Sequence, residues 1–264
     1  MKKILLVILL MFSMLPIFAK EKIEMSNNDF GIYVFKIDTN KYGNKIKPYM
    51  TPVLTTPKKL YEDECFDLVV NGGFFDVKNG KTVSYVTIDN ELVGDVKKYT
   101  ELVEKLAKED RLEKVLSRGE LRIYEKRNKL KFDIAYHTDP LKKGWTLKHA
   151  LQAGPIIAPD MDLVKEGFVI YEGDIVKSQS VDILKRRERT AIGLKGKYLY
   201  IVAFTSDKKV DAYEMRDYMT KALKLDKVLA LDGGLSTAVS SKDVSFGSLG
   251  KYQRKVKSFL VVER

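Results

Sequence analysis

The sequence of 264 residues contains little cysteine, histidine or proline, and each shortage narrows what the protein can be. A single cysteine, Cys65, excludes an intramolecular disulfide. The only histidines, His137 and His149, have no ligand pattern near them, so we predict no histidine-based metal site. Seventeen Gly and seven Pro are too few for a low-complexity protein. With 45% hydrophobic and 31% charged residues, the chain must fold around a packed core.

Long apolar runs are also absent, with one exception at the start of the chain. Two lysines precede an apolar run that ends at Phe18, and Ala19 is followed directly by Lys20. The run is short for a bilayer span, and a small residue before charge is typical of a signal peptidase site. We predict a signal peptide over residues 1–19 and an exported mature protein, periplasmic or secreted, over 20–264 with no stable membrane insertion. An uncleaved anchor is the alternative.

The formal net charge is +11 at pH 7. Such a balance indicates nucleic acid, an anionic envelope polymer or simple solubility. Export argues against nucleic acid, and acidic residues lie among the basic ones along most of the chain. The densest basic run, at 185–189, is typical of a solvated loop. We therefore expect no nucleic-acid partner.

Strand-like segments dominate from residue 30 onward. Helical spacing predicts one helix or two between Tyr99 and Leu116, and a capping box at Asp211 and Glu214 begins another helix. A Pro- and Lys-rich connection is expected over 41–60. Strands with helices inserted singly favour a single compact α+β domain of mixed or mostly antiparallel sheets. The predicted strands are 31–37, 66–71, 83–88, 91–93, 121–124, 130–135, 151–157, 167–171, 190–194, 198–204, 228–231 and 257–262.

Three predicted strands run into a glycine-containing turn beside a polar residue, and a fourth begins with a cation. Adjacent glycines let the backbone approach a ligand and present N–H groups to an anion. Tight strand-ending turns with no ligand are the alternative at each place. The guanidinium of Arg189 matches phosphate oxygens, although a rim salt bridge would also explain it. The four motifs read Asn-Gly-Gly-Phe-Phe at 71–75, Gln-Ala-Gly-Pro at 152–155, Arg-Thr-Ala-Ile-Gly at 189–193 and Leu-Asp-Gly-Gly-Leu-Ser-Thr-Ala at 231–238.

In order and approximate spacing these motifs resemble those of the phosphodiester glycosidase family. The resemblance spans about residues 66–262. One departure concerns the last motif, where many members have a third glycine and this chain has Leu235. If that position needs a positive φ or a free N–H near substrate, Leu235 impairs binding.

The resemblance implies a hydrolase that cleaves the glycosidic bond of sugar-1-phosphodiesters in glycans or glycolipids. Because a phosphate ester leaves as a stable anion, one carboxylate and a cationic phosphate holder suffice. Asp232 is the predicted carboxylate, Arg189 the phosphate holder and Asn71 the group that positions sugar or water. No cofactor or metal is predicted, and the oligomeric state stays open. The predicted substrate-binding residues are Gly72, Gly73, Phe74, Asp76, Gln152, Gly154, Thr190, Gly233, Gly234 and Ser236.

Two other functions stay open. A non-catalytic binder of anionic polysaccharide would keep the same cleft, and Leu235 favours it. An envelope assembly factor would expose an apolar patch to a protein partner. For the hydrolase, we expect Asn71, Gln152, Arg189 and Asp232 to converge on one pocket.

Overall fold

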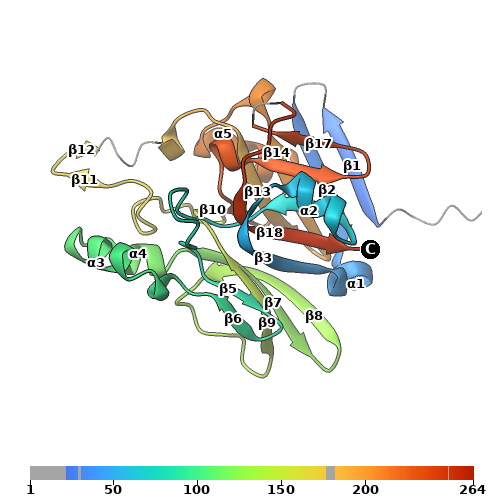
Figure 1. Cartoon of the computed structure of the whole chain (residues 1–264), viewed down its shortest axis with the longest axis horizontal. Coiled ribbons are helices and arrows are strands. Elements are labelled where there is room, and N and C mark those ends of the chain that lie inside the picture. The colour runs from blue at the N-terminus through green and yellow to red at the C-terminus, as the bar shows by residue number, and fades with distance from the viewer. Residues whose placement is uncertain (1–21, 29–30, 177–181, 249) are drawn as a thin grey trace, which may run out of the picture.

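The computed structural model describes residues 22–28, 31–176, 182–248 and 250–264 (Figure 1). The predicted signal peptide lies outside these described residues. Within them the strands form three larger antiparallel sheets and one two-stranded ribbon, joined by short helices. This confirms a single compact α+β domain with mostly antiparallel sheets. In the described part of the chain, no helix is long and apolar enough to cross a membrane.

Each sheet brings together strands that are distant in sequence. The first sheet has the order β1 (Ile23–Asn28), β2 (Ile32–Asp38), β14 (Tyr198–Phe204), β13 (Arg189–Lys195), β15 (Lys227–Ala230) and β10 (Ile156–Ala158). The second has the order β17 (Ser245–Gly247), β16 (Ala238–Ser241), β4 (Phe66–Asn71), β18 (Val256–Glu263) and β3 (Ile46–Thr55). The third has the order β6 (Glu91–Gly94), β5 (Val86–Ile88), β9 (Thr146–Gln152), β7 (Gly119–Lys126) and β8 (Lys129–Tyr136). The ribbon pairs β11 (Tyr171–Glu172) with β12 (Ile175–Val176).

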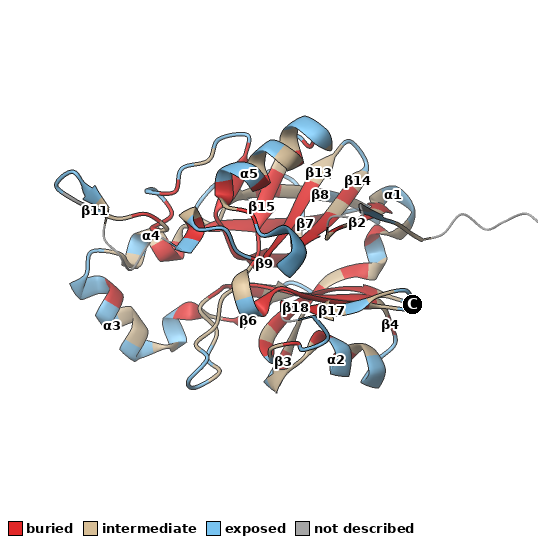
Figure 2. Ribbon diagram, turned by 90° about the horizontal axis from the view of Figure 1, so that it is seen from above, coloured by how far each residue is buried: buried red, intermediate tan, exposed pale blue. Residues whose placement is uncertain are grey.

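Short helices cover the outer faces of two sheets, as Figure 2 shows. On the first sheet, Met215 and Met219 pack against buried residues of β13 and β14. On the second sheet, Leu60 packs against Phe66 and Val69 of β4. The α-helices are α1 (Thr39–Tyr42), α2 (Pro57–Asp63), α3 (Thr100–Lys108), α4 (Leu112–Leu116) and α5 (Ala212–Asp217), and α5 continues as a π-helical turn over Tyr218–Ala222.

One hydrophobic core joins the three large sheets. Ile201 of the first sheet, Val70 of the second and Leu121 of the third are all fully buried in a single cluster. Because each sheet places alternate side chains on this shared core, the three sheets are held in fixed relative positions. The ends of their strands can therefore build a rigid site.

Several local predictions are confirmed. The Tyr99–Leu116 segment forms two helices, α3 and α4. The Asp211 side chain accepts hydrogen bonds from the first turn of α5, and the Asp211 N–H donates to the Glu214 carboxylate, which completes the capping box. The predicted strands at 83–88 and 91–93 correspond to β5 and β6, although β5 covers only Val86–Ile88, and the two-residue turn between them has positive φ at Asp89 and Asn90.

The predicted strand at 167–171 is wrong for all but its last residue. Gly167 has a φ of +68°, and the N–H groups of Phe168 and Val169 both donate to the Leu163 carbonyl, which closes a turn. Val169 is nevertheless buried against the first sheet's outer cluster. The segment is apolar because it is packed, not because it pairs in a sheet.

The predicted connection over 41–60 is also wrong, because it contains β3 and α2. Among the strands that the structure describes, β3 lies at the edge of the second sheet and pairs with β18. Proline is tolerated on an edge strand, where its missing N–H breaks no interior ladder. Because it contains Pro48 and Pro52, the sequence of this strand resembles that of a loop. The predicted strand at 151–157 divides into the end of β9 and the start of β10.

Close approach between the second and third sheets predicts the cost of a methyl group at Gly73. A Cβ there would overlap the Gln152 carbonyl oxygen and lie 2.5 Å from Ser84 Oγ. We expect Gly73→Ala to lower the free energy of unfolding by about 1–3 kcal/mol, measured by urea denaturation. Gly43→Ala is the control, because its Cβ would meet only side-chain atoms, at 3.1 Å from Phe132 and beyond. Equal stability of the two variants would refute the steric argument.

Candidate active site

A cavity of about 650 Å³ lies where the ends of several strands meet. Because β13 and β15 are antiparallel, the start of β13 and the end of β15 lie at the same end of the first sheet. The loop between β17 and β18 and the chain after β4 complete the wall. The residues lining the cavity are Phe74, Gly154, Phe168, Asp182, Ile183, Arg187, Glu188, Arg189, Lys209, Ala230, Leu231, Asp232, Gly233, Gly234, Leu235 and Arg254.

Backbone hydrogen bonds fix the position of Asp232 in the cavity wall. The N–H of Leu231 donates to the Thr190 carbonyl at 2.8 Å, which extends the pairing of β15 with β13. The N–H of Asp232 donates to the Gly72 carbonyl at 3.0 Å, so the chain crosses here from the first sheet to the second. The half-buried Asp232 side chain is therefore attached to backbone that is fixed between two sheets.

Desolvation raises the pKa of the Asp232 carboxyl to about 6. A hydrogen bond from Ser236, the positive charge of Arg254, the Gly233 N–H and the charge of Arg189 each lower it by less. The carboxylate is thus ionised at neutral pH but holds a proton far more readily than an exposed aspartate. A pKa near the working pH suits a group that takes or gives a proton.

Arg189 lines the same cavity, but most of its guanidinium hydrogen bonds are made with backbone carbonyls of the protein. Its Nη2 donates to the carbonyls of Asp182 at 2.6 Å and Lys185 at 2.8 Å, and its Nε donates to that of Val210 at 3.3 Å. Burial lowers the pKa of its guanidinium. The Nη1 atom lies beside Gly233, where a Cβ would be 3.4 Å from it. Arg189 therefore organises the 182–185 turn and presents one side to the cavity.

Arg254 is a cavity residue that the sequence motifs do not mark. It comes from the loop between β17 and β18, is half-buried, and its charge lowers the pKa of Asp232. It forms no ion pair with any described residue. A basic side chain inside the irregular run 251–255 gives no spacing signal, so only the fold brings it to Asp232.

Two further cations and two acids line the rim. Arg187 lies 3.9 Å from the Asp182 carboxylate, and Lys209 lies 3.4 Å from that of Glu188. With Arg189 and Arg254 the wall carries four basic side chains. The wall also carries three carboxylates, those of Asp182, Glu188 and Asp232, and the remaining excess of positive charge favours an anionic ligand.

Asn71 and Thr190 lie behind the cavity, fully buried. The Asn71 Nδ2 donates to the Asp232 carbonyl at 2.6 Å, and its Oδ1 accepts from the Thr190 hydroxyl at 2.8 Å and the Ala238 N–H at 3.1 Å. These bonds join β4, β13 and β16 around the Asp232 turn. Ser236 is buried beside Asp232, to which its hydroxyl donates.

The glycine motif after β4 places only Phe74 in the cavity. The N–H groups of Gly72 and Gly73 donate to the Ser258 carbonyl at 2.8 Å and to its hydroxyl at 3.0 Å. Asp76 lies outside the cavity, where it accepts hydrogen bonds from the Tyr99 hydroxyl and from a backbone N–H. The Tyr99 bond is the main reason that the pKa of Asp76 is lowered.

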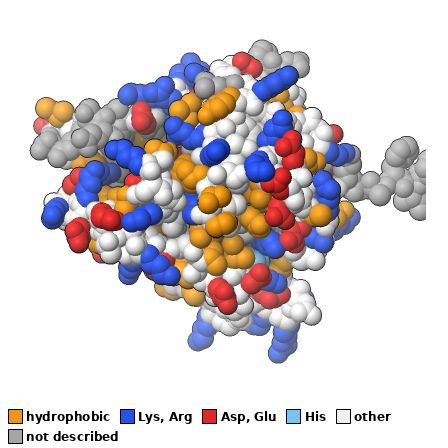
Figure 3. Space-filling view, viewed as in Figure 1, with side chains coloured by type: hydrophobic (Ala, Val, Ile, Leu, Met, Phe, Trp, Pro, Cys, Tyr) orange, Lys and Arg blue, Asp and Glu red, His pale blue; other side chains and the backbone are white. Residues whose placement is uncertain are grey.

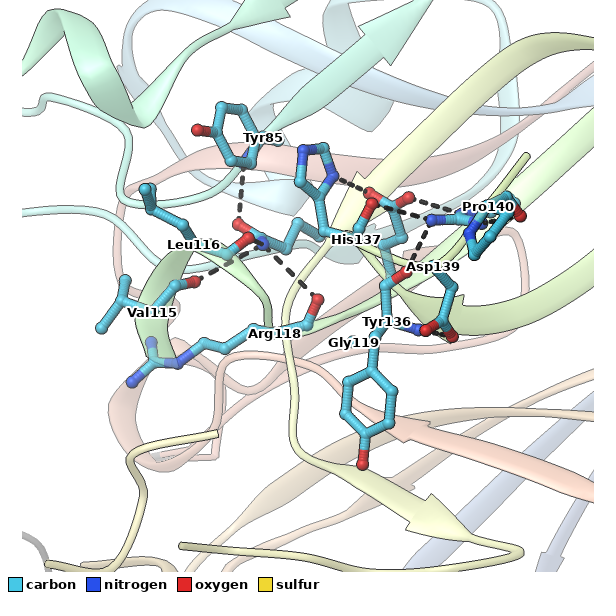
Figure 4. Close-up of polar contacts among 12 residues, drawn as sticks. Tyr85, Val115, Leu116, Arg118, Gly119, Tyr136, His137, Asp139 and Pro140 are labelled. Atoms are coloured by element: carbon cyan, nitrogen blue, oxygen red, sulfur yellow. Dashed lines mark hydrogen bonds and ion pairs between the residues drawn. The ribbon is translucent and has the colours of Figure 1, made fainter. Parts of the chain in front are cut away.

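Gln152 also lies away from the cavity, inside the third sheet. Its Oε1 accepts from the Tyr85 N–H at 3.1 Å and its Nε2 donates to the Leu116 carbonyl at 2.9 Å; Tyr85 and Leu116 are labelled in Figure 4. Its amide therefore ties α4 to the sheet. Gly154, two residues later, does line the cavity, but its N–H donates to the Ala230 carbonyl at 2.9 Å.

Glu166 is a buried carboxylate that the sequence motifs do not reveal. Its two oxygens accept from the N–H groups of Gly119 at 2.8 Å and Ile156 at 2.7 Å, and burial raises its pKa. A Cβ on Gly154 would lie 2.7 Å from Glu166 Oε2, so only glycine fits beside it. Glu166 thus holds the backbone that carries Gly154 into the cavity wall.

The chain matches a family of known proteins. Residues 65–263, well over half of it, match the phosphodiester glycosidase family. The chain belongs to that family. No curated protein matches the sequence.

Solved structures show the fold of this phosphodiester glycosidase domain in distant relatives. The catalytic domain of zebrafish N-acetylglucosamine-1-phosphodiester alpha-N-acetylglucosaminidase, auto-inhibited by its pro-peptide, is similar with a TM-score of 0.64 and 12% identity, over 92% of this chain and 81% of that one. A Burkholderia pseudomallei protein described as exported has a TM-score of 0.59 and 12% identity, over 88% and 74%. A hypothetical Synechocystis protein has a TM-score of 0.52 and 13% identity, over 92% and 61%.

The departure from the family pattern at Leu235 has a local explanation. The positive φ of the last motif, +58°, occurs at Gly234, and Leu235 follows within a 3-10 turn over Gly234–Ser236. Leu235 needs no left-handed backbone, and its side chain is 43% exposed on the cavity rim. Among the described residues, no group of three or more His, Cys, Asp and Glu side chains is placed to hold a metal ion.

The raised pKa of Asp232 predicts that this residue lowers stability at neutral pH. In the folded state it binds a proton more tightly than an ordinary aspartate, whose pKa is 3.8, does in the unfolded chain. The energetic penalty of ionising it is therefore absent below pH 4 and complete above about pH 6. We expect Asp232→Asn to raise the free energy of unfolding at pH 7 by about 1–3 kcal/mol, with little change at pH 4. Denaturation from pH 4 to 8 measures this. The exposed Asp207→Asn is the control, and a destabilised Asp232→Asn at pH 7 would contradict the prediction.

Proposed function

We propose that this protein is an exported hydrolase that cleaves the glycosidic bond of sugar-1-phosphodiesters. The single observation that carries the proposal is the half-buried Asp232 carboxylate, with its raised pKa, in a cavity with four basic side chains on its wall. Family membership supports the reaction class. The mature chain would begin after Ala19 and act on glycans or glycolipids of the cell envelope or on acquired glycoconjugates.

The basic side chains would hold the phosphodiester. Arg254 has no ion pair with a described residue and is the first choice for direct contact, with the Nη1 side of Arg189 next to it. Both guanidinium groups match pairs of phosphate oxygens. Their positive charge would stabilise the second negative charge that appears on the phosphate when its ester bond to the sugar breaks.

Asp232 would act at the other end of the scissile bond. The bond between the anomeric carbon and the phosphate ester oxygen breaks, and its electron pair leaves with the phosphate. Water supplies the new hydroxyl group, and the ionised Asp232 accepts the proton of that water. No acid is needed on the leaving group, because a phosphate monoester is a stable anion. One carboxylate is then enough for the reaction.

Neighbouring residues would position the sugar and the Asp232 carboxylate for this reaction. Phe74 and Phe168 line the cavity with ring centroids 5.7 Å apart, and an aromatic face suits the C–H face of a sugar ring. Asn71 would position Asp232 through the Asp232 carbonyl, since its side chain is already hydrogen-bonded to the protein.

Activity on a substrate panel tests the proposal. Purified residues 20–264 are incubated with phosphodiesters of N-acetylglucosamine, glucose and mannose at C1, and release of reducing sugar is measured. We expect Asp232→Asn to lower kcat by about a thousandfold or more while binding is retained. Arg254→Met should lower kcat/KM by about 10–100-fold, because it removes one charge-assisted phosphate contact.

Lys255→Met is the matched control, because Lys255 is exposed, adjacent in sequence and not part of the cavity wall. Binding without turnover of every diester by the wild-type protein would favour the non-catalytic binder of anionic polysaccharide. Full activity of Asp232→Asn on any diester would overturn the assigned role of Asp232.

The pH profile follows from the same assignment. If Asp232 must be ionised, kcat/KM on a diester falls as the pH drops through about 6, tenfold per pH unit below it. Because the charge of Arg254 lowers the pKa of Asp232, Arg254→Met should move this acid limb to higher pH. An activity that instead falls as the pH rises above 6 would make Asp232 a proton donor.

A further inference from the structure

A second hollow, of about 710 Å³, lies between α1 and the turn of the β7–β8 hairpin. It adjoins a smaller hollow of about 250 Å³ that shares Thr39, Asn40, Leu130 and Lys131 with it and extends to Tyr198. The two form one continuous surface groove, here called the lysine groove. Its lysines are Lys41, Lys129, Lys131, Lys148 and, in the smaller hollow, Lys197.

The charges in the lysine groove are mostly uncompensated. Lys148 pairs with Glu125 at 3.1 Å, and Lys197 pairs with Asp38 at 2.8 Å. Lys41, Lys129 and Lys131 form no ion pair with any residue in the described part of the chain. The ammonium groups of Lys131 and Lys142 lie close to each other, and this contact between two cations lowers the pKa of Lys131. Two adjacent cations repel each other, and an anion placed between them would relieve the repulsion.

Aromatic and amide side chains accompany these cations. Trp145 lines the larger hollow and Tyr198 the smaller one, so an aromatic ring stands in each part of the groove. Asn40, Asn44 and Asn128 line it with exposed amide groups. Aromatic faces stack on sugar rings and amides hydrogen-bond to hydroxyl groups. Single-stranded nucleic acid is less suited, because successive bases stack on several closely spaced aromatic rings.

The lysine groove is separate from the catalytic cavity. β7 begins at Gly119, which hydrogen-bonds to Ala153 and Glu166 beside the cavity residue Gly154, and it ends at Lys126, next to the groove turn. Eight residues of extended chain span about 23 Å at roughly 3.3 Å per residue. In Figure 1 α1 lies at the opposite end of the molecule from α3 and α4. A single small ligand cannot occupy both places.

Acidic and basic side chains elsewhere are interspersed, as Figure 3 shows for one face. Against that mixed surface, three unpaired lysines beside the only tryptophan of the chain form a distinctive combination. We propose that the lysine groove binds an anionic glycan chain, independently of the catalytic cavity. The proposal does not depend on the hydrolase function, although a groove of this kind would hold a polymeric substrate near the enzyme.

The only tryptophan gives the experiment a direct signal. Trp145 fluorescence is followed while the mature protein is titrated with dextran sulfate oligosaccharides, unsulfated dextran of the same length, and an oligonucleotide of twelve thymidines. We expect a saturable change with dextran sulfate and none with dextran. The double variant Lys129→Gln with Lys131→Gln should weaken binding about tenfold or more and leave hydrolysis of a small diester unchanged.

The matched control is Lys126→Gln with Lys143→Gln, which removes the same charge from the same hairpin and loop without touching the groove. Equal weakening by both pairs would reduce the interaction to nonspecific charge and overturn the proposal. So would tighter binding of the oligonucleotide, or binding that Arg254→Met abolishes and the groove pair does not. Loss of diester hydrolysis in Asp232→Asn with glycan binding intact would separate the two sites.

Discussion

The buried amide of Asn71 is the interaction on which the site depends. Its donor holds the Asp232 carbonyl, and its acceptor receives the Thr190 hydroxyl and the Ala238 N–H. A buried amide is costly unless its hydrogen bonds are made, so these contacts are obligatory in the folded protein. They lock the ends of β4 and β13 to the turn after β15. The position of the Asp232 carboxylate follows from that lock, since a side chain can be no better placed than the backbone that carries it.

Two carboxylates near the cavity illustrate how burial leads to different roles. Glu166 is fully buried and both of its oxygens accept backbone N–H groups, so it supports the chain around Gly154. Asp232 is only half-buried, keeps access to the cavity and has basic side chains facing it. Desolvation raises the pKa of both groups, but only Asp232 can meet a ligand. Geometry therefore separates a structural carboxylate from a reactive one where pKa alone does not.

Cations also fall into two kinds. Arg189 donates four hydrogen bonds to backbone carbonyls, and Arg118 is buried with its guanidinium 4.2 Å from the Phe168 ring centroid and 5.1 Å from that of Phe74. Both support the cavity wall from behind. Arg254 and the unpaired lysines of the groove instead face open space. A positive charge without an internal partner is available to an anion from outside, so Arg254 and these lysines are the residues expected to bind one.

The sequence by itself determined much of the local structure and the family. Alternation and apolar runs located β4 and β14 to the residue or nearly so, the capping box located α5, and four ordered motifs identified the phosphodiester glycosidase family. These signals are local, because they arise from hydrogen bonds and side-chain spacing within a few residues. The same patterns predicted that Arg189 and Asp232 lie near the ends of strands, and both residues line the cavity.

Only the tertiary structure decided which polar groups are free. Gln152 and the glycines at 72 and 73 stand in motifs that suggest ligand contacts, yet their hydrogen bonds are made with α4, Tyr85 and Ser258. Arg254 lies in no motif and reaches the cavity through the path of its loop. The prolines of β3 argue against a strand in the sequence, and they are tolerated because β3 lies at the edge of its sheet. In each case the outcome depends on which distant strands pair, and a donor or acceptor is available for function only if that pairing leaves it unsatisfied.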